Sequence, residues 1–441
     1  MNELELLNTE TTINQKKALL KAMNEVDIAE FFETLDPAEA VKLFRLLNKD
    51  KAADVFAYLS SDAQEELVQR FTDKEITSVM AELYADDATD FIEEMPANVV
   101  TRILKHTAPE KRAIINQLMN YPEDSIGSVM TVELVSLKLN DTVKSALDKI
   151  RKQAIDKETI YTLYVTSPER KLLGVVEARH LLSNQEDVLV KDIMSTDFVK
   201  AITTDDKERL VAIFNKYPLL ALPVTDLEGR LVGIVTHDDA MQVIREEFSE
   251  DFELIGKLQT SDRPYLKDNP FHLAKNRFLW LMILMVSATL TGFIISSFED
   301  AILVVPALVT FIPMLMDTGG NAGSQASTLI IRGIALEEIK PKDGFKIFLK
   351  EVSVSLIVGV GLALVNFIRI WIMYDIKLAA VISITLIAVV FMAKTIGALL
   401  PLVAVKFKLD PALMVAPLIT TIVDAGALIV FFLIAKLILG I

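Results

Sequence analysis

Long apolar runs dominate the C-terminal part of the chain, residues 271–441, and they constrain its fold more than any other feature. We identify five, each as long as the ~20 residues that a helix needs to cross a bilayer. They cover about 278–298, 301–331, 347–373, 378–405 and 411–439. One such run could be a buried helix of a soluble protein, but five in succession predict a five-helix α transmembrane domain.

Basic residues in the connecting loops predict how this domain is oriented. Lys and Arg precede the first run and fill the loops after the second and fourth runs, whereas the alternate loops hold few. Because positive loops stay on the cytoplasmic side, we expect a multi-pass protein of the cell (inner) membrane with its N-terminus cytoplasmic and its C-terminus outside. The opening residues, MNELELLNTE, lack the basic and apolar segments of a signal peptide, which agrees with this orientation.

Acidic charge is concentrated in residues 1–270, which carry 32 Lys and Arg against 50 Asp and Glu, whereas residues 271–441 carry 13 against 10. This excess argues against nucleic acid as a partner and suits cations, although an acidic surface kept for solubility would look the same. The chain has no Cys and four scattered His, which excludes thiolate sites and disfavours a histidine metal site. No G-x-x-x-x-G-K-[ST] motif is present, so we expect no nucleotide-driven pump. We also do not expect an enzyme.

Two internal repeats organise the acidic part. Residues 32–71 align without a gap on residues 80–119, with apolar positions three and four apart, which predicts an α-helical superhelix over 1–127. The matched apolar pairs are Phe32 with Met80, Leu35 with Leu83, Leu43 with Phe91, Val55 with Ile103 and Phe71 with Met119.

The second repeat consists of LLGVVEARHLL (172–182) and LVGIVTHDDAM (231–241), each preceded by an apolar strand. Strand, turn, strand and helix, twice over, predict two small α/β modules. They resemble a tandem of cystathionine-β-synthase (CBS) domains, at 128–190 and 191–250. Such tandems often bind adenine nucleotides through a Thr-x-x-Asp motif. The second module has Thr236 and Asp239, but the first has Glu177 and His180, so at most one ATP site per tandem is expected.

Polar residues inside the apolar runs are the candidates for function, because burying them in lipid is costly. Asp424 lies deep in the last run, where it faces either an ion pathway or a neighbouring helix. The second run contains PMLMDTGGNAGSQAST (313–328), which predicts a broken or closely packed helix lining a cavity, with simple small-residue packing as the alternative. Asp410 is either only a helix cap before Pro411 or also a charge at a pore mouth.

These membrane motifs, PMLMDTGGNAGSQAS and DPALMVAPLITTIVD, together with the acidic repeat and the CBS modules, closely resemble the MgtE family of magnesium channels. The resemblance implies a homodimer in the lipid bilayer that passes Mg²⁺ into the cytoplasm down its electrochemical gradient. It implies a Mg²⁺ site at Asp424 and Thr420, with Asp410 near the cytoplasmic mouth. The expected pore-lining residues are Asp317, Gly319, Gly320, Asn321 and Gly323.

The resemblance also implies closure by cytoplasmic Mg²⁺ bound among the acidic domains and a connecting plug helix at 251–270. The expected regulatory ligands are Asp54, Asp86, Asp90, the Gly127 carbonyl, Asp206, Asp239, Glu247, Glu250 and Asp251. Asp86 and Asp90 are four residues apart on one helix face, where like charges repel unless a cation lies between them. Without the resemblance, such faces would be interpreted as solvated surface.

Three positions depart from the family pattern. Pro218 and Gln242 stand where the family can have carboxylates, which predicts fewer or weaker regulatory ions. Lys394 adds a cation in the middle of the fourth run, where it pairs with Asp317 or extends toward an interface. Two other functions stay open: a membrane-tethered divalent-ion sensor that conducts nothing, and a transporter of other divalent cations such as Co²⁺ or Mn²⁺.

Overall fold

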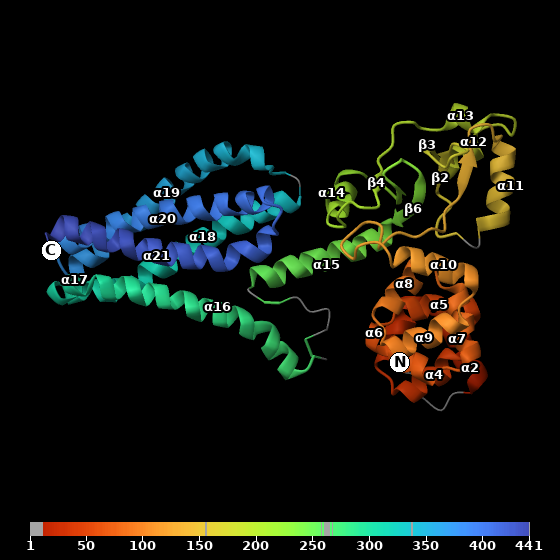
Figure 1. Cartoon of the computed structure of the whole chain (residues 1–441), viewed down its shortest axis with the longest axis horizontal. Coiled ribbons are helices and arrows are strands. Elements are labelled where there is room, and N and C mark those ends of the chain that lie inside the picture. Colours follow the sequence, from red (N-terminus) through yellow and green to blue (C-terminus); the bar gives the residue numbers. More distant parts are fainter. Residues whose placement is uncertain are drawn as a thin grey trace. The chain divides into compact units, whose positions relative to one another are not determined.

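The computed structural model describes residues 12–154, 157–256, 258–259, 265–266, 268–336 and 338–440, without the side chains of 413–417. It divides the chain into two compact units, Met1–Val243 and Ile244–Ile441 (Figure 1).

Short helices form the N-terminal part of the first unit and confirm the helical repeat. They are α2 (Ile13–Ala22), α3 (Glu25–Glu33), α4 (Pro37–Phe44), α5 (Lys49–Ala57), α6 (Ser61–Arg70), α7 (Asp73–Glu82), α8 (Ala85–Glu93), α9 (Ala97–His106) and α10 (Pro109–Leu118). Helices α3 to α6 begin 48 residues before α7 to α10, in the same order. The matched apolar residues lie in one core, except that Phe71 is buried while Met119 is exposed, because no third repeat follows α10 to cover it.

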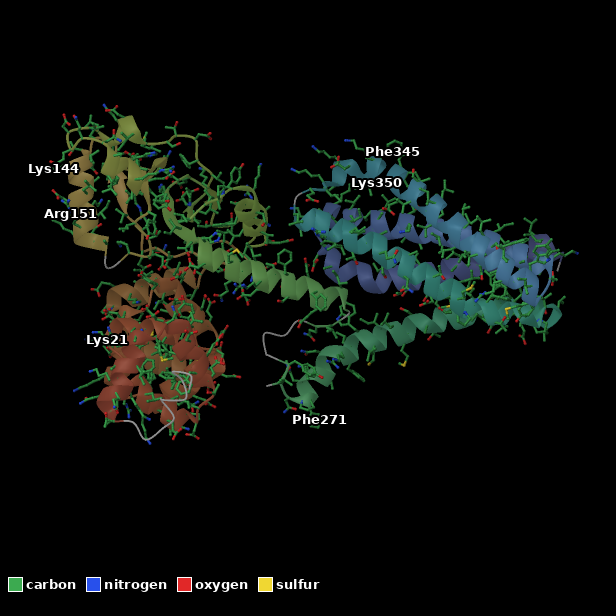
Figure 2. The ribbon with its side chains drawn as sticks, turned by 180° about the vertical axis from the view of Figure 1, so that it is seen from behind. Lys21, Lys144, Arg151, Phe271, Phe345 and Lys350 are labelled. Atoms are coloured by element: carbon green, nitrogen blue, oxygen red, sulfur yellow. The ribbon has the colours of Figure 1, made fainter. Side chains whose placement is uncertain are left out.

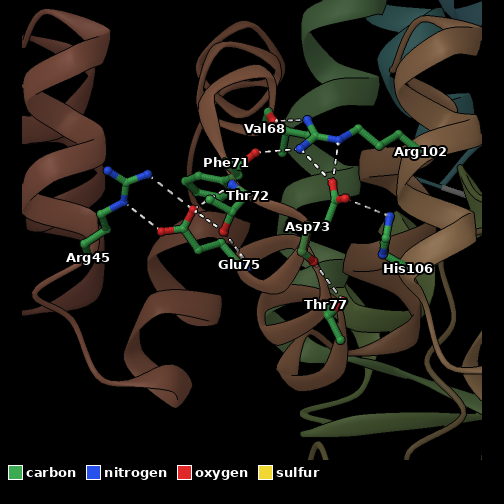
Figure 3. A network of polar contacts seen from close by, with 9 residues as sticks. All are labelled: Arg45, Val68, Phe71, Thr72, Asp73, Glu75, Thr77, Arg102 and His106. Carbon is green, nitrogen blue, oxygen red and sulfur yellow. Dashed lines mark hydrogen bonds and ion pairs between the residues drawn. The ribbon is translucent and has the colours of Figure 1, made fainter.

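Polar contacts at the start of α7 join the two repeats (Figure 3). Thr72 and Glu75 form a capping box that satisfies backbone N–H groups at this helix end. The Arg45 guanidinium, from the first repeat, donates to Glu75 over 2.7 Å and holds the pKa of that carboxyl down at about 2. Arg102 of α9 donates to the Val68 carbonyl of α6 in the first repeat over 3.0 Å, and it binds Asp73 of its own repeat at 3.0 Å. Exposed ion pairs of this kind each contribute little to the free energy of folding. Their main effect is to fix the register of one repeat against the other.

Two α/β modules follow, and they confirm the CBS prediction. The first contains β1 (Ser136–Lys138), α11 (Val143–Gln153), β2 (Thr162–Thr166), β3 (Leu172–Glu177) and α12 (Ala178–Ser183). The second contains α13 (Val190–Ile193), β4 (Ala201–Ile202), α14 (Arg209–Lys216), β5 (Ala221–Thr225), β6 (Leu231–Thr236) and the start of α15 (His237–Ile255). In each three-stranded sheet the first pair of strands is parallel and the second antiparallel.

The modules exchange their opening segments. Met130, which opens the first module, packs on Gly233 of the second, and Met194 packs on Gly174 of the first. Next to them, Thr131 pairs with Ile234, and Ser195 pairs with Val175. Because each sheet is covered by a segment of the other module, the two modules form one body.

Helix α15 differs from the expected connection. We predicted a separate plug helix over 251–270, but α15 runs without interruption from the second module to Ile255 and ends there. Residues 258–259, 265–266 and 268–269 are not helical, and 257, 260–264 and 267 lie outside the described residues. The predicted plug helix is therefore present only as the last turn of α15 among the residues that the structure describes.

The second unit consists of long helices. They are α16 (Pro270–Ser297), α17 (Glu299–Val304), the 3-10 helix η2 (Pro306–Phe311), α18 (Ile312–Ala335), the 3-10 helix η3 (Pro341–Asp343), α19 (Gly344–Met373), α20 (Ile376–Lys406) and α21 (Pro411–Leu439). Of the described segments, four are long and apolar enough to cross a membrane: Pro270–Ser297, Pro341–Met373, Ile376–Lys406 and Leu418–Leu439. Helix α18, the main part of the second predicted span, is not among them because polar residues fill its middle.

Apolar side chains cover the outside of this unit. Phe278, Leu281 and Met285 are exposed on α16, and Ile357, Val365 and Ile372 on α19. Aromatic side chains are exposed at helix ends, among them Phe271 and Phe345, which Figure 2 shows projecting from the ribbon. An apolar surface with aromatic residues at helix ends is typical of a domain in contact with lipid, which confirms the membrane domain.

Candidate functional site

One face of α18 carries polar side chains on an otherwise apolar unit. Asp317, Asn321, Ser324, Gln325 and Thr328 are all exposed. Their spacing of four, three, one and three residues places them on one side of the helix, and we call this set the polar stripe. Because unsatisfied polar groups are costly in hydrocarbon, the polar stripe requires a polar surface or water beside it.

The opposite face of α18 is closely packed. Gly319 and Gly323 are buried, and a β-carbon at Gly319 would come within 2.8–2.9 Å of Val389 and Val423. A β-carbon at Gly397 of α20 would collide with the backbone carbonyl of Gly323. Small residues thus let α18 approach α20 and α21 closely, as in other membrane helix packings.

Helix α18 is continuous through residues 313–328, so the break considered from the sequence is not there. The interruption lies earlier, where α17 gives way to η2. Of the five expected pore-lining residues, Asp317 and Asn321 lie on the polar stripe and Gly320 faces open space, whereas Gly319 and Gly323 lie on the packed face. Small-residue packing therefore accounts for those two glycines.

Helix α21 carries the other expected pore residues. Asp410 is its N-cap, with Oδ1 accepting a hydrogen bond from Ala412 N–H over 2.7 Å. Thr420 and Asp424 are one turn apart and half-buried. Each follows a residue that packs on α18, since Ile419 and Val423 contact its glycines. Asp424 therefore lies beside α18, at the level of its packed glycines.

The end of α15 meets the start of α21. Leu254 is buried in one cluster with Ala412, Ala322 and Ile331, which belong to α21 and α18. Asp251, one turn before Leu254, has its pKa raised to about 6, first by burial and then by the negative charges of Asp410 and Glu250. Of the other predicted ligands here, Glu247 is half-buried and Glu250 exposed. The structure thus brings Asp251 and Asp410 together.

Lys394 is only 5% exposed, and it lies one helical turn after Val390, which faces Gly359 of α19. Within the described part of the chain it forms no ion pair, and Asp317 is exposed on the polar stripe, so neither the predicted pairing nor an extended side chain is observed. Antiparallel α19 and α20 place Gly359 against Ile387 and join Ser383 to the carbonyl of Ala363. This register puts Glu351 of α19 at the level of Lys394.

Carboxylates also gather where the helical repeats meet the CBS modules. We call the acidic junction the set of Asp86 and Asp87 from α8, Glu133 and Glu158 from loops of the first module, and Asp239 from the first turn of α15. Asp86 is 8% exposed, and its Oδ1 is buried without a hydrogen-bond partner among the described residues. The same holds for Oε2 of Glu158.

Burial is the main cause of abnormal acidity at the acidic junction. It raises the pKa of Asp86 well above its usual value, that of Asp87 to about 6 and that of Glu158 to about 8, with the neighbouring carboxylates adding to each shift. Lys111, whose Nζ donates to the carbonyl of Leu83, supplies a basic group beside Asp86 and Asp87. In the described part of the chain, no three acidic or histidine side chains are close enough to hold a bare metal ion.

The other predicted regulatory residues are less closely grouped. Asp54 contributes to the raised pKa of Asp87, so it lies near the acidic junction. Asp90 is on the exposed side of α8. Asp206 is exposed and pairs through its backbone with Ser125, while the N–H of Gly127 donates to the Thr203 carbonyl over 3.0 Å.

Three residues of the acidic junction, Asp87, Glu133 and Glu158, were not predicted from the sequence. Asp87 is next in sequence to the predicted ligand Asp86, and this adjacency could have identified it. Glu133 and Glu158 stand alone in loops, with no motif around them, and only the tertiary fold brings them to Asp86.

The predicted nucleotide motif lies at the start of α15. The hydroxyl of Thr236 is 2.6 Å from Oδ1 of Asp238 and also hydrogen-bonds Asp239. Asp239 therefore belongs both to this motif and to the acidic junction.

Comparison with known proteins covers nearly the whole chain. Three family models match: the MgtE intracellular N domain over 23–124, the CBS domain over 126–187 and 190–246, and the MgtE divalent cation transporter domain over 312–434. The Magnesium transporter MgtE of Thermus thermophilus is 33% identical over 430 residues, 96% of this chain and 95% of its own length. That of Bacillus subtilis is 30% identical over 425 residues, 96% and 94% respectively.

Solved structures that are similar to the acidic part of the chain also come from magnesium transporters. The soluble part of a magnesium transporter is similar with a TM-score of 0.52 and 31% identity, over 56% of this chain and 96% of that one. The cytosolic domain of the Mg²⁺ channel MgtE in complex with ATP gives the same TM-score and identity, over 55% and 98%. The chain belongs to the MgtE family of divalent cation transporters.

Proposed function

We propose that this protein passes Mg²⁺ across the membrane through a pathway lined by the polar stripe of α18. The polar stripe is the observation that carries the proposal, because it is exposed on a unit whose outer surface is otherwise apolar. A second copy of the chain, with its own polar stripe facing the first, would shield both from lipid and enclose water between them. The relatives named magnesium transporters, which match over nearly their full length, support the choice of ion.

The residues along this pathway offer the oxygen ligands that Mg²⁺ prefers, and Mg²⁺ keeps several of its waters when it binds. We assign the central site to the Asp424 carboxylate and the Thr420 carbonyl, with Asp317, Asn321 and Gly320 lining the pathway. Asp410 would attract the ion at the cytoplasmic end. Ions would move down their electrochemical gradient, since the sequence has no P-loop.

The acidic groups supply a means of regulation. Without a cation, the carboxylates of the acidic junction repel one another, as do Asp251 and Asp410. Cytoplasmic Mg²⁺ bound at both places would remove the repulsion and hold the pathway closed. Asp54, Asp90, Asp206, the Gly127 carbonyl, Glu247 and Glu250 would add to the binding surface. This arrangement requires the N-terminus to lie in the cytoplasm.

Thr236 and Asp239 are the residues we assign to ATP. The ATP complex of a similar cytosolic domain supports this assignment. Because Asp239 also belongs to the acidic junction, its carboxylate would be shared between nucleotide binding and cation binding.

Flux into proteoliposomes tests the proposal. Mg²⁺ uptake by the full-length protein should fall at least tenfold in Asp424→Asn, which keeps the side-chain size and removes the charge. Asp300→Asn, an exposed carboxylate of α17, is the matched control and should keep its uptake. Equal uptake by Asp424→Asn and the wild type would remove Asp424 from the pathway.

The same assay separates the alternatives. A membrane-tethered sensor would show no uptake in the wild type, although Mg²⁺ would still protect its cytoplasmic domains from protease. A transporter of other divalent cations would take up Co²⁺ or Mn²⁺ at least as fast as Mg²⁺.

A further inference from the structure

Helix α19 carries lysines on the outside of the membrane unit. Lys346 and Lys350 are four residues apart, so they lie on one side of the helix, and both are exposed. Figure 2 shows Lys350 near the start of α19, where Phe345 is also labelled. Lys342, which is exposed too, lies in η3 directly before the helix. We call these three residues the lysine stripe.

The same side of α19 continues as an apolar face beyond Lys350. It consists of exposed residues at the spacing of helical turns, namely Ile357, Val360, Leu364 and Ile368. Trp371, which is 55% exposed, ends this face. At about 1.5 Å per residue, Trp371 and Lys350 are about 30 Å apart along the helix, which is the thickness of the hydrocarbon core of a bilayer.

This length places the lysine stripe in the bilayer. Because Trp is favoured at the membrane interface, Trp371 marks one edge of the hydrocarbon, and Lys350 then lies at the opposite edge. Lys346 lies one turn further out, at the level of the lipid phosphates of the leaflet that the basic loop faces. The lysine stripe is therefore beside lipid headgroups and not only in bulk water.

Nearby carboxylates do not neutralise the lysine stripe. Nζ of Lys346 is 3.7 Å from Asp343, but this lysine side chain is 86% exposed, and such ion pairs are weak. Lys342 and Lys350 form no ion pair within the ranges that the structure describes. Glu351, next to Lys350 in sequence, has its Oε2 buried inside the unit. The outward surface here is therefore positively charged.

We propose that the lysine stripe binds the headgroup of an anionic phospholipid, whose acyl chains lie along the apolar face of α19. The phosphodiester accepts hydrogen bonds from the ammonium groups of Lys346 and Lys350, which are one helical turn apart and reach the same phosphate. A zwitterionic headgroup fits less well, because its own ammonium group meets the lysines. The inference uses the membrane unit alone and does not depend on the proposed Mg²⁺ pathway.

The inner side of the same end of α19 connects this site to the rest of the unit. Ile347, one residue after Lys346, packs on a cluster from α18 and α20 that consists of Ala326, Ile330, Ala398 and Leu402. Helix α18 is the helix that carries the polar stripe. A lipid bound on the outer side of α19 holds this end of the helix against α18 and α20, so lipid binding should stabilise the unit.

Native mass spectrometry of the delipidated full-length protein tests the proposal. Phosphatidylglycerol and phosphatidylcholine with identical acyl chains are titrated separately, and the dissociation constant of the first bound lipid is measured. The wild type should bind phosphatidylglycerol at least tenfold more tightly. In Lys346→Gln/Lys350→Gln this constant should rise about thirtyfold for phosphatidylglycerol and stay unchanged for phosphatidylcholine.

Two control variants separate charge at this site from charge elsewhere. Lys346→Arg/Lys350→Arg keeps both charges and should bind phosphatidylglycerol as the wild type does. Lys377→Gln removes an exposed lysine near the start of α20, at the other end of the α19 and α20 pair, and should also leave binding unchanged. All variants should unfold at the wild-type temperature without lipid, because these lysines are exposed. Phosphatidylglycerol should raise that temperature in the wild type and not in Lys346→Gln/Lys350→Gln.

Three results would overturn the proposal. Equal affinity of the wild type and Lys346→Gln/Lys350→Gln for phosphatidylglycerol would place lipid binding elsewhere. Equally tight binding of glycerol 3-phosphate, which has the phosphate without acyl chains, would make the site one for a soluble phosphate. A shift of Lys346→Gln/Lys350→Gln from dimer to monomer with unchanged lipid affinity would mean that a second copy of the chain covers this face.

Discussion

Buried carboxylates set the chemistry of the first unit at the scale of single residues. Burial raises the pKa of Asp87 to about 6 and that of Glu158 to about 8, above the usual value of about 4 for such groups. Between pH values near the usual pKa of about 4 and the raised pKa of each group, the folded chain binds protons that the unfolded chain has already released. Its stability relative to the unfolded chain therefore falls as the pH rises through this window.

We accordingly expect the free energy of unfolding of the first unit, measured with denaturant in Mg²⁺-free buffer, to decrease from pH 5 to pH 8. The upper limit is about 1.4 kcal/mol per pH unit for each group that titrates. Saturating Mg²⁺ should flatten this dependence, because the ion replaces the protons. Stability that rises with pH in the metal-free protein would contradict the pKa shifts.

Part of the acidic junction could be predicted from the sequence. Asp86 and Asp239 were predicted from matching family segments, and the fold brings them together. Glu158 could not be predicted, because its approach to Asp239 depends on the pairing of Thr131 with Ile234, and strand pairing over such a separation has no local signal. The predicted surroundings of Lys394, an ion pair with Asp317 or an interface, are not observed for a similar reason. The sequence of one helix does not show which other helix packs against its buried face.

Close helix packing determines the membrane unit at the scale of elements. Gly397→Ala should force α18 and α20 apart, since the added β-carbon meets the Gly323 carbonyl, which is backbone and cannot turn away. Overpacking of this kind costs about 1–3 kcal/mol. Gly320→Ala is the matched control, because nothing lies within 4 Å of its β-carbon position. Thermal unfolding in detergent should show a lower midpoint for the first variant only, and equal midpoints would argue against the close approach.

The facing sides of α19 and α20 allow a second prediction. Glu351 has a buried carboxylate oxygen without a hydrogen-bond partner among the described residues, and the helix register places it level with buried Lys394. The two groups form no direct ion pair, but opposite charges at one level of a buried face attract each other more strongly than they would in water.

Lys394→Met and Glu351→Gln should therefore each destabilise the membrane unit, and the double variant should be more stable than the sum of the two effects predicts. A double-mutant cycle of thermal unfolding in detergent measures this coupling. Strictly additive effects would mean that the two charges do not interact.

The boundaries of the helices show which of them could be predicted from the spacing of apolar residues. Apolar spacing predicted the short helices of the repeat, because each buries one stripe in a shared core. It did not show that α18 continues unbroken through three glycines, since their helix-breaking tendency is offset by contacts with α20 and α21 that are absent from the local sequence. Likewise, the continuation of α15 to Ile255 depends on the burial of Leu254 against α18 and α21.

The arrangement of the whole membrane unit carries a prediction about sidedness. Figure 1 places the C-terminus at the same end of this unit as α17, and Lys436 near that terminus lies 5.2 Å from the ring of Phe298. The connection from α16 to α18 and the C-terminus should therefore lie on one side of the membrane. The basic loop after α18 should lie on the other, and the positive-inside rule assigns that side to the cytoplasm.

Because the chain has no cysteine, single replacements give a clean test of this orientation. In intact cells, a thiol reagent that does not cross membranes should label Glu299→Cys, which is exposed in α17. It should label Glu338→Cys, exposed between α18 and α19, only after the cells are permeabilised. The reverse pattern would place the acidic domains outside, where cytoplasmic Mg²⁺ could not reach them, and would contradict the regulation proposed here together with the orientation.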